Sequence, residues 1–215
     1  MTKKQVKQEE TARPPDRTPG RPRDPETERR ILDVALQMLR EGGYNRMSVD
    51  AVALEAGVSK PTIYRRWSSK ADLATAAIRT LRLLEPAVAT RSGAGDLTAT
   101  LENFSRSLLR PNGMSLIGTV IAEEAHTPEL IALFRERLVS PRRKMLRAIL
   151  DRAKAQGEIR PGADLDCAVN MLVGAFYARY LVDSKIPNNF VRHLVEIVCK
   201  GIENPGHRPI GTGIS

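Results

Sequence analysis

Apolar residues recur every three or four positions along most of the chain, and no stretch of any length alternates apolar and polar residues as a strand does. This spacing predicts amphipathic helices, because positions three and four apart share one helix face. The expected helices cover residues 25–42, 49–56, 60–67, 70–84, 96–110, 114–125, 127–156, 164–183 and 188–202. The sequence therefore predicts an all-α fold of about nine helices.

Start and stop signals define the first four helices. Short polar side chains cap free N–H groups at a helix start, and proline fits the first turn. Such starts occur at Asp24-Pro25, Ser48, Ser59 and Ser69-Lys70-Ala71-Asp72, the last of which matches a capping box. These helices are expected to end near Gly42-Gly43, Gly57, Trp67 and Leu84, where Pro86 follows.

Pro141 lies inside the helix expected over residues 127–156. Proline has no N–H to donate, and its ring crowds the carbonyl group four residues earlier. The helix is therefore predicted to kink or split near Ser140.

The helix expected over residues 164–183 is apolar on two sides. One stripe runs from Leu165 to Leu181 at helical spacing, and a second consists of Cys167, Met171, Gly174, Ala178 and Val182. Such a helix has to be covered on both sides, which favours a partner beyond the chain itself.

Length and composition fit a folded protein of a reducing compartment. The chain has 215 residues, of which 41% are hydrophobic, enough for a core without disulfides or metals. Cys167 and Cys199 lie in apolar helical stretches and are interpreted as small buried hydrophobes. A membrane-spanning helix needs about 18 consecutive apolar residues, and no run in the chain approaches this length. The N-terminus also lacks the apolar segment of a signal peptide. We therefore expect a cytoplasmic protein without membrane association.

The formal net charge is +9, with an excess of +3 in residues 1–24, +2 in residues 25–85 and +4 in residues 86–215. Because the excess is spread out, net charge alone is weak evidence for a polyanion partner. One local run is more informative. Between residues 60 and 70 the chain has no acidic residue and four cations, namely Lys60, Arg65, Arg66 and Lys70.

The two short helices expected around this run have the spacing of a helix-turn-helix. Ala53 is small enough for the helices to approach, Gly57 permits a left-handed turn, and Ile63 anchors the second helix. The outer face of that helix then carries Lys60, Thr62, Tyr64, Arg65, Arg66 and Trp67. This is the kind of surface that a recognition helix presents to a major groove, although Ile63 and Trp67 are better interpreted as core.

The segment from Asp50 to Leu73, DAVALEAGVSKPTIYRRWSSKADL, resembles the DNA-binding signature of the tetracycline-repressor (TetR/AcrR) family of bacterial transcription regulators. The matching positions are Ala53, Gly57, Ser59, Thr62, Ile63, Tyr64, Trp67, Lys70 and Leu73. The sequence departs from the family pattern at Pro61, Arg66 and Trp67, which leaves the base preference open.

The resemblance implies a division of the chain and a set of DNA contacts. A helix-turn-helix domain is expected over residues 24–69, a linking helix over 70–84, and a larger helical effector-binding and dimerisation domain over 86–203. Ser48, Tyr64 and Lys70 would bind backbone phosphates, and Lys60, Thr62 and Arg65 would face bases or nearby phosphates. Ser59, Pro61 and Arg66 complete the expected DNA-binding set.

Residues 1–23 and 204–215 are expected to form a disordered basic arm and a flexible tail. Arg21 and Arg23 lie just before the first helix, where arginine can enter a narrow minor groove. A solvated linker explains the same residues equally well.

Because paired recognition helices span successive grooves, a homodimer on a palindromic double-stranded DNA operator is expected. The last two helices would form a four-helix bundle with those of the partner. The interface residues would be Gly174, Tyr177, Ala178, Val191, Leu194, Val195 and Val198. Replacing Leu194 by Asp is then predicted to give monomers.

The resemblance also implies a cavity for a small, largely apolar effector. Candidate lining residues are Phe104, Leu108, Met114, Ile117, Ile121, Phe134, Met145, Ile149, Met171 and Phe176, with His126, Asn170 and Tyr177 as polar points. Apolar residues at helical spacing are more often plain core, so both interpretations stay open. Binding would favour a state in which the recognition helices no longer match the groove spacing.

Three other classes of protein were weighed. The sequence does not favour an enzyme. It has three histidines but no metal-ligand spacing, no phosphate-binding loop and no nucleophile motif, so we assign no catalytic, metal or cofactor site. A non-specific architectural DNA-binding protein remains an alternative that competition with random DNA would test. A helical scaffold module leaves the cations of residues 60–70 unexplained.

Overall fold

The computed structural model describes residues 24–80, 92–109, 113–183 and 185–206. Within them the fold is all-α, as the sequence predicts. The helices are α1 (Pro25–Arg46), α2 (Val49–Glu55), α3 (Lys60–Tyr64), α4 (Lys70–Arg79), α5 (Gly93–Leu108), α6 (Gly113–Ala122), α7 (Pro128–Phe134), the π-helical turn η1 (Arg135–Val139), α8 (Ser140–Ala155), α9 (Leu165–Val182) and α10 (Phe190–Ile202). Since α7, η1 and α8 follow one another without a gap, the described residues form nine helical segments.

Most of the predicted helix starts are confirmed in atomic detail. The side chains of Asp24, Ser48 and Ser69 accept hydrogen bonds from backbone N–H groups of the first turns of α1, α2 and α4. Ser59 occupies the cap position before α3 as predicted, but its side chain makes no cap hydrogen bond, and its Oγ lies 2.9 Å from the Thr62 hydroxyl instead. Pro61 removes one of the N–H groups that such a cap would serve.

Several helix boundaries differ from the prediction. Helix α3 ends at Tyr64 rather than residue 67, and α6 ends at Ala122 rather than residue 125. Gly43 leaves the helical conformation at φ 70°, as expected of a glycine stop, but the chain resumes helical turns to Arg46. Helix α5 begins at Gly93 rather than residue 96, because Ser92 Oγ accepts a hydrogen bond from Gly95 N–H. The predicted end of the fourth helix at Leu84, the N-terminal arm and most of the C-terminal tail lie outside the described residues.

Pro141 perturbs its helix without splitting it. The turn before it, η1, is π-helical, and Ser140 N–H donates to the carbonyl group of Arg135 five residues earlier. Widening the helix by one residue relieves the crowding that the proline ring would otherwise cause. The predicted irregularity is thus confirmed as a π-turn within one long segment.

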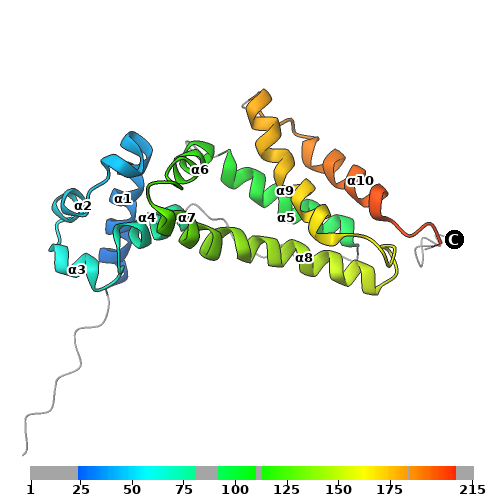
Figure 1. The fold of residues 1–215 in the computed structure, drawn as a ribbon, viewed down its shortest axis with the longest axis horizontal. Coiled ribbons are helices and arrows are strands. Elements are labelled where there is room, and N and C mark those ends of the chain that lie inside the picture. The colour runs from blue at the N-terminus through cyan, green and yellow to red at the C-terminus, as the bar shows by residue number, and fades with distance from the viewer. Residues whose placement is uncertain (1–23, 81–91, 110–112, 184, 207–215) are drawn as a thin grey trace, which may run out of the picture.

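The described residues form two hydrophobic cores. The first joins α1–α4 to α6, α7 and η1, the helices that lie toward one end of the molecule in Figure 1, and includes residues as far along the chain as Leu116, Leu130 and Leu138. The second joins α5 to α8, α9 and α10, with Phe176 fully buried in it. Helices α1–α4 therefore share their core with α6 and α7, which provides a mechanical link to the rest of the protein.

Candidate nucleic-acid interface

Helices α2 and α3 form a helix-turn-helix around a tight turn. Gly57 has a φ of 64°, the left-handed conformation that the turn needs. Ala53, Ile63 and Trp67 are buried, which confirms the interpretation of Ile63 and Trp67 as core residues. The Nε of Arg30 on α1 also donates to the Ala56 carbonyl at 2.8 Å. These contacts hold α3 so that its other face is free.

The free face of α3 carries most of the predicted DNA-binding side chains. Lys60, Pro61 and Arg65 are exposed, Thr62 is half-buried, and 46% of Tyr64 is exposed. Ser48 and Ser59 are exposed at the beginnings of α2 and α3, where N–H groups favour phosphate. The structure thus brings seven of the predicted contacts to one surface.

Hydrogen bonds order part of this surface. The Thr62 hydroxyl lies 2.9 Å from Ser59 Oγ and accepts a hydrogen bond from Arg65 Nη2 at 3.1 Å. Ser59 directly precedes α3, Thr62 lies within it and Arg65 directly follows it, so these contacts orient the guanidinium before any partner arrives. Such orientation lowers the entropic cost of binding.

Arg66 does not lie on the free face, contrary to the prediction. Only 14% of its side chain is exposed, and its Nη1 lies 3.9 Å from Glu28 on α1. Its Nε is buried without a hydrogen-bond partner. Arg66 lies in the turn after α3, where its N–H donates to the carbonyl group of the buried Ile63 at 2.9 Å, and its side chain points toward Glu28 of α1.

Lys70, the first residue of α4, is half-buried. Its Nζ lies 4.2 Å from the centre of the Tyr44 ring, a cation–π contact. Burial lowers the pKa of Lys70, while the nearby charge of Glu123 acts in the opposite direction. Arg21 and Arg23 lie outside the described residues.

The structure adds one recognition-surface residue that the sequence reasoning missed. Asp50 on α2 forms an ion pair with Lys60, whose Nζ lies 2.8 Å from Asp50 Oδ1. The hydrogen bond that Lys60 donates to Asp50 is the main cause that raises the pKa of Lys60. No local signal could identify this pair, since ten positions separate the two residues and the turn alone brings them together.

Polar contacts join the helix-turn-helix to α6, α7 and η1. Asp72 of α4 accepts a hydrogen bond from Arg137, Ser69 Oγ donates to Glu129 at 2.7 Å, and Asn45 Nδ2 donates to Glu123 at 2.6 Å. We call these three contacts the polar junction. They connect the DNA-proximal helices to the segment that leads into α8.

The buried Asp72 predicts a pH-dependent stability. Burial alone would raise its pKa, but the hydrogen bonds from Arg137 and Ser68 outweigh burial and lower the pKa below its ordinary value. A lowered pKa stabilises the fold above the pKa of the unfolded chain, and this stabilisation is lost as pH falls through the folded-state pKa. Asp72→Asn is therefore expected to reduce the free energy of unfolding by about 2 kcal/mol at pH 7 and by less below about pH 4.

Urea denaturation at pH 7 and below about pH 4 measures the free energy of unfolding of the wild type and of Asp72→Asn. Asp151→Asn is the control, because Asp151 pairs with Arg147 on an exposed helix face and should contribute below about 1 kcal/mol. Equal losses in both variants, or a loss in Asp72→Asn that persists at low pH, would contradict the prediction.

The residues predicted to line an effector cavity do not gather in one place. Phe104, Leu108, Ile149 and Phe176 are buried in the second core, with Met114, Ile117 and Tyr177 packed partly against it. Met145 is half-buried on α8. Phe134 belongs to the first core, whereas Ile121, His126, Asn170 and Met171 are exposed. The centre of the group is the aromatic pair Phe104 and Phe176, whose rings are 4.9 Å apart, edge to face.

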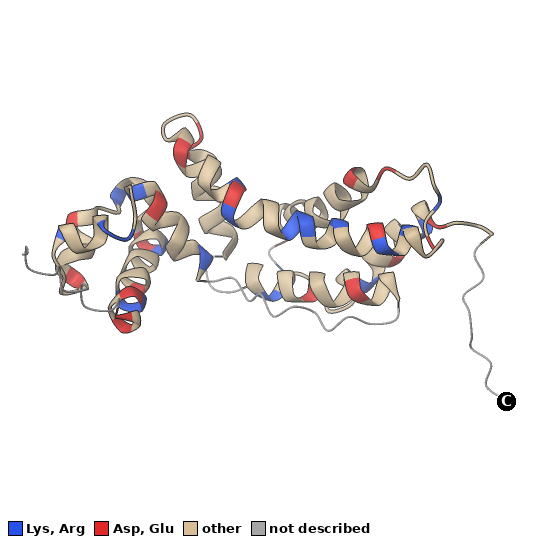
Figure 2. Cartoon of the chain, turned by 90° about the horizontal axis from the view of Figure 1, so that it is seen from below, with Lys and Arg blue, Asp and Glu red and all other residues tan. Residues whose placement is uncertain are grey.

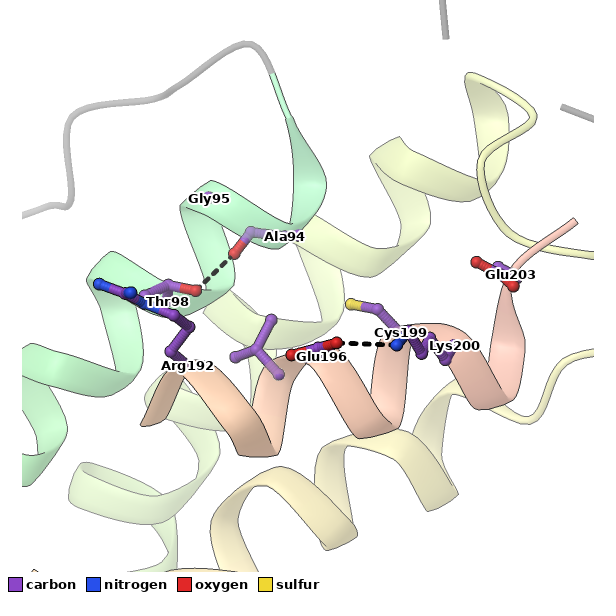
Figure 3. A pocket seen from close by; sticks show the side chains of 9 residues that line it. Ala94, Gly95, Thr98, Arg192, Glu196, Cys199, Lys200 and Glu203 are labelled. Atoms are coloured by element: carbon purple, nitrogen blue, oxygen red, sulfur yellow. Dashed lines mark hydrogen bonds and ion pairs between the residues drawn. The ribbon is translucent and has the colours of Figure 1, made fainter. Parts of the chain in front are cut away.

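Two surface grooves border the second core. One, of about 390 Å³, runs between the start of α5 and α10 (Figure 3), where Lys200 Nζ pairs with Glu196 at 2.7 Å. The other, of about 370 Å³, lies between α8 and α9. Lys and Arg outnumber acidic residues along α8 (Figure 2), but Arg147 in this groove already pairs with Asp151 and Asp166. Neither groove is lined by the predicted effector residues.

The predicted interface residues fall into two groups. Gly174 and Ala178 are exposed on α9, next to Met171 and Val182 of the same apolar stripe. On α10, however, Val191, Val195 and Val198 are buried in the second core and Leu194 is half-buried, so this face is covered within the protomer. The exposed apolar residue of α10 is Ile197, of which 67% is accessible.

Among the described residues, α9 is the one helix that is long and apolar enough to cross a membrane. Leu165, Val169, Leu172 and Phe176 on it are buried in the second core. It is therefore a core helix with one uncovered apolar face. Within the described residues no group of three or more His, Cys, Asp or Glu side chains could hold a metal ion.

A helix-turn-helix with an exposed, cation-bearing second helix on an all-α body defines a class of DNA-binding transcriptional regulators. Residues 31–77 match the model of the bacterial regulatory proteins of the tetR family, and residues 88–198 match that of the tetracyclin repressor-like C-terminal domain. The chain belongs to the tetR family of transcriptional regulators.

Individual relatives agree with this assignment. The chain is 31% identical over 191 residues to the uncharacterized HTH-type transcriptional regulator YdeS of Bacillus subtilis, covering 86% of this chain and 93% of that one. It is 32% identical over 184 residues to the DNA-binding transcriptional repressor TetR of Mycobacteroides abscessus, covering 83% and 94%. A solved structure of FadR from Bacillus subtilis in complex with stearoyl-CoA has a TM-score of 0.65 at 20% identity, covering 81% and 99%, a likeness of fold.

Proposed function

We propose that this regulator is a ligand-responsive repressor that binds a palindromic operator as a homodimer in the cytoplasm. The observation that carries the proposal is the free face of α3. There, exposed Lys60, Tyr64 and Arg65 project from a helix that the buried Ile63 anchors. Arg65 is suited to a guanine edge, and Ser48, Tyr64 and Lys70 to flanking phosphates.

The uncovered face of α9 supports the homodimer. Cys167, Met171, Gly174, Ala178 and Val182 lie on it in an exposed apolar stripe, and Ile197 on α10 extends the surface. A two-fold axis through this face would cover the stripe and pair the two recognition helices. Ile197→Asp is a better test than Leu194→Asp, because Leu194 also packs inside the protomer.

An apolar effector would act through the second core. We infer that a ligand inserted beside Phe104 and Phe176 would displace α8, and that the polar junction at Arg137 and Asp72 would pass the movement to α4. The FadR relative binds stearoyl-CoA, so this compound is a suitable first probe for release of DNA.

Selection from a random duplex library tests DNA recognition. The full-length chain should enrich a palindrome that footprints the promoter of its own gene, and unrelated DNA should compete at least 1,000-fold less well. Enrichment of no sequence, with equal competition by random DNA, would instead indicate an architectural DNA-binding protein.

Deleting residues 1–23 is expected to weaken operator binding about tenfold at physiological salt. Arg21 and Arg23 would each contribute a minor-groove or phosphate contact, so the slope of log affinity against log salt should fall by up to about 2 per subunit. Anisotropy titrations at several salt concentrations measure both quantities. An unchanged affinity and slope would identify the arm as a solvated linker.

A further inference from the structure

The carboxylate of Asp50 contacts Lys60, one of the cations on the free face of α3. Asp50 is the second residue of α2, and Lys60 is the first residue of α3. The Nζ of Lys60 lies 2.8 Å from Oδ1 and 3.0 Å from Oδ2 of Asp50, so the ammonium group is shared between both oxygens. The pair faces solvent, since 48% of the Lys60 side chain and 72% of the Asp50 side chain are exposed.

This pair weakens binding to DNA that offers only phosphates. Any duplex presents the phosphate backbone, and a free ammonium group would bind it regardless of sequence. Here the nearest counter-charge of Lys60 is Asp50, and a phosphate that approaches Lys60 must also approach a negative carboxylate. Like charges at such distances repel, so sequence-independent contact at this point is disfavoured.

The same pair can read a base pair. An ammonium group beside a carboxylate presents a donor next to an acceptor, in a fixed order along the surface. In the major groove a G·C pair presents the complementary order, because guanine O6 accepts and cytosine N4 donates, and a T·A pair presents the same order with thymine O4 and adenine N6. Either pair satisfies both side chains without breaking their contact, whereas the reversed pairs, C·G and A·T, place donor against donor and acceptor against acceptor.

We infer that Asp50 is a specificity-determining residue, which lowers affinity for random DNA and selects G·C or T·A over the reversed pairs C·G and A·T at one position of each half-site. The inference rests on the proposed function and adds to it a residue outside the helix that carries the other base contacts. An acidic residue in the first turn of a helix also stabilises that helix. The test therefore has to separate a role in DNA choice from a role in the fold.

Asp50→Asn removes the charge and keeps the shape of the side chain. Glu55→Gln is the matched control, because Glu55 is an exposed acid on the same helix whose side chain forms no ion pair within the described residues. Each full-length variant is titrated by anisotropy against the operator enriched by the wild type and against a random duplex of equal length. Thermal melting monitored by circular dichroism checks that both variants fold.

Asp50→Asn is expected to bind the random duplex about tenfold more tightly, with a salt slope larger by about 1 per subunit, because Lys60 becomes free to contact a phosphate. Affinity for the operator should stay equal or fall, so the ratio of the two affinities drops at least tenfold. Repeating the selection should lose the preference for G·C or T·A over C·G and A·T at one position per half-site. Glu55→Gln should change each affinity less than twofold.

Two results would overturn the inference. One is an equal change in both variants, and the other is a loss of affinity of Asp50→Asn for both duplexes by the same factor. If the wild type enriches no sequence, the proposed function fails, whereas enrichment together with an unchanged affinity ratio in Asp50→Asn rejects the role of Asp50 alone.

Discussion

Gly174→Arg is expected to convert the proposed homodimer into a folded monomer that has lost at least 100-fold in operator affinity. A Cβ atom at Gly174 meets no atom within 4 Å, so the protomer has room for the new side chain. Arginine is also a better helix former than glycine, by up to about 1 kcal/mol. At the proposed interface, however, the arginine prevents close approach of two α9 helices and buries a charge. Loss of the second half-site then removes the avidity of paired binding.

Light scattering and an operator titration measure these effects. Gly118→Arg on α6 is the matched control, because a Cβ atom there also meets nothing within 4 Å. This control should remain a dimer and bind normally. A dimer that persists in Gly174→Arg, at concentrations where the wild type is dimeric, would place the interface elsewhere.

Arg65→Met is expected to reduce operator affinity 10-fold to 100-fold, which corresponds to about 1–3 kcal/mol for a bidentate contact with a base edge. The guanidinium group is exposed and oriented by Thr62, so the substitution removes a contact to DNA rather than a contact in the core. The preference at one base position per half-site should disappear, while the salt slope should change little. Site selection with the variant and anisotropy at several salt concentrations test both expectations.

A phosphate contact should behave differently. Lys70→Met is expected to weaken operator and random DNA by similar factors and to lower the salt slope by about 0.9 per subunit. Arg79→Met, at an exposed position near the end of α4, is the control and should change neither. If Arg65→Met instead lowered the slope and kept the base preference, Arg65 would be a phosphate contact.

The sequence predicts the helices, most of their caps and the helix-turn-helix, because the interactions that form them join residues close together in the chain. Helical spacing, the Asp24 and Ser48 caps and the left-handed turn at Gly57 depend on hydrogen bonds and steric limits between near neighbours. The 24-residue signature from Asp50 to Leu73 is local in the same way. Two local predictions were wrong: the cap hydrogen bond of Ser59 and the first residue of α5. Each depends on one side-chain hydrogen bond for which a neighbouring residue offers another partner.

The tertiary structure decided which side of each helix is used. On α10 the valines that looked suited to a partner are buried within the protomer, whereas α9 leaves its second stripe uncovered. Both helices have apolar faces, and periodicity does not say whether a face packs against this chain or another. The two-sided pattern of α9 was the one signal that favoured a partner.

By itself, the sequence determined the all-α class, the helix-turn-helix and the family. Local periodicity and helix caps predict the helices, and a short signature identifies the family. Only the tertiary structure decided that Asp50 pairs with Lys60, that Arg66 turns inward to Glu28, and that α4 is tied to the segment leading into α8. The contacts of the polar junction join residues 60 to 78 positions apart. Such contacts arise from the packing of distant helices, and no nearby residue specifies them.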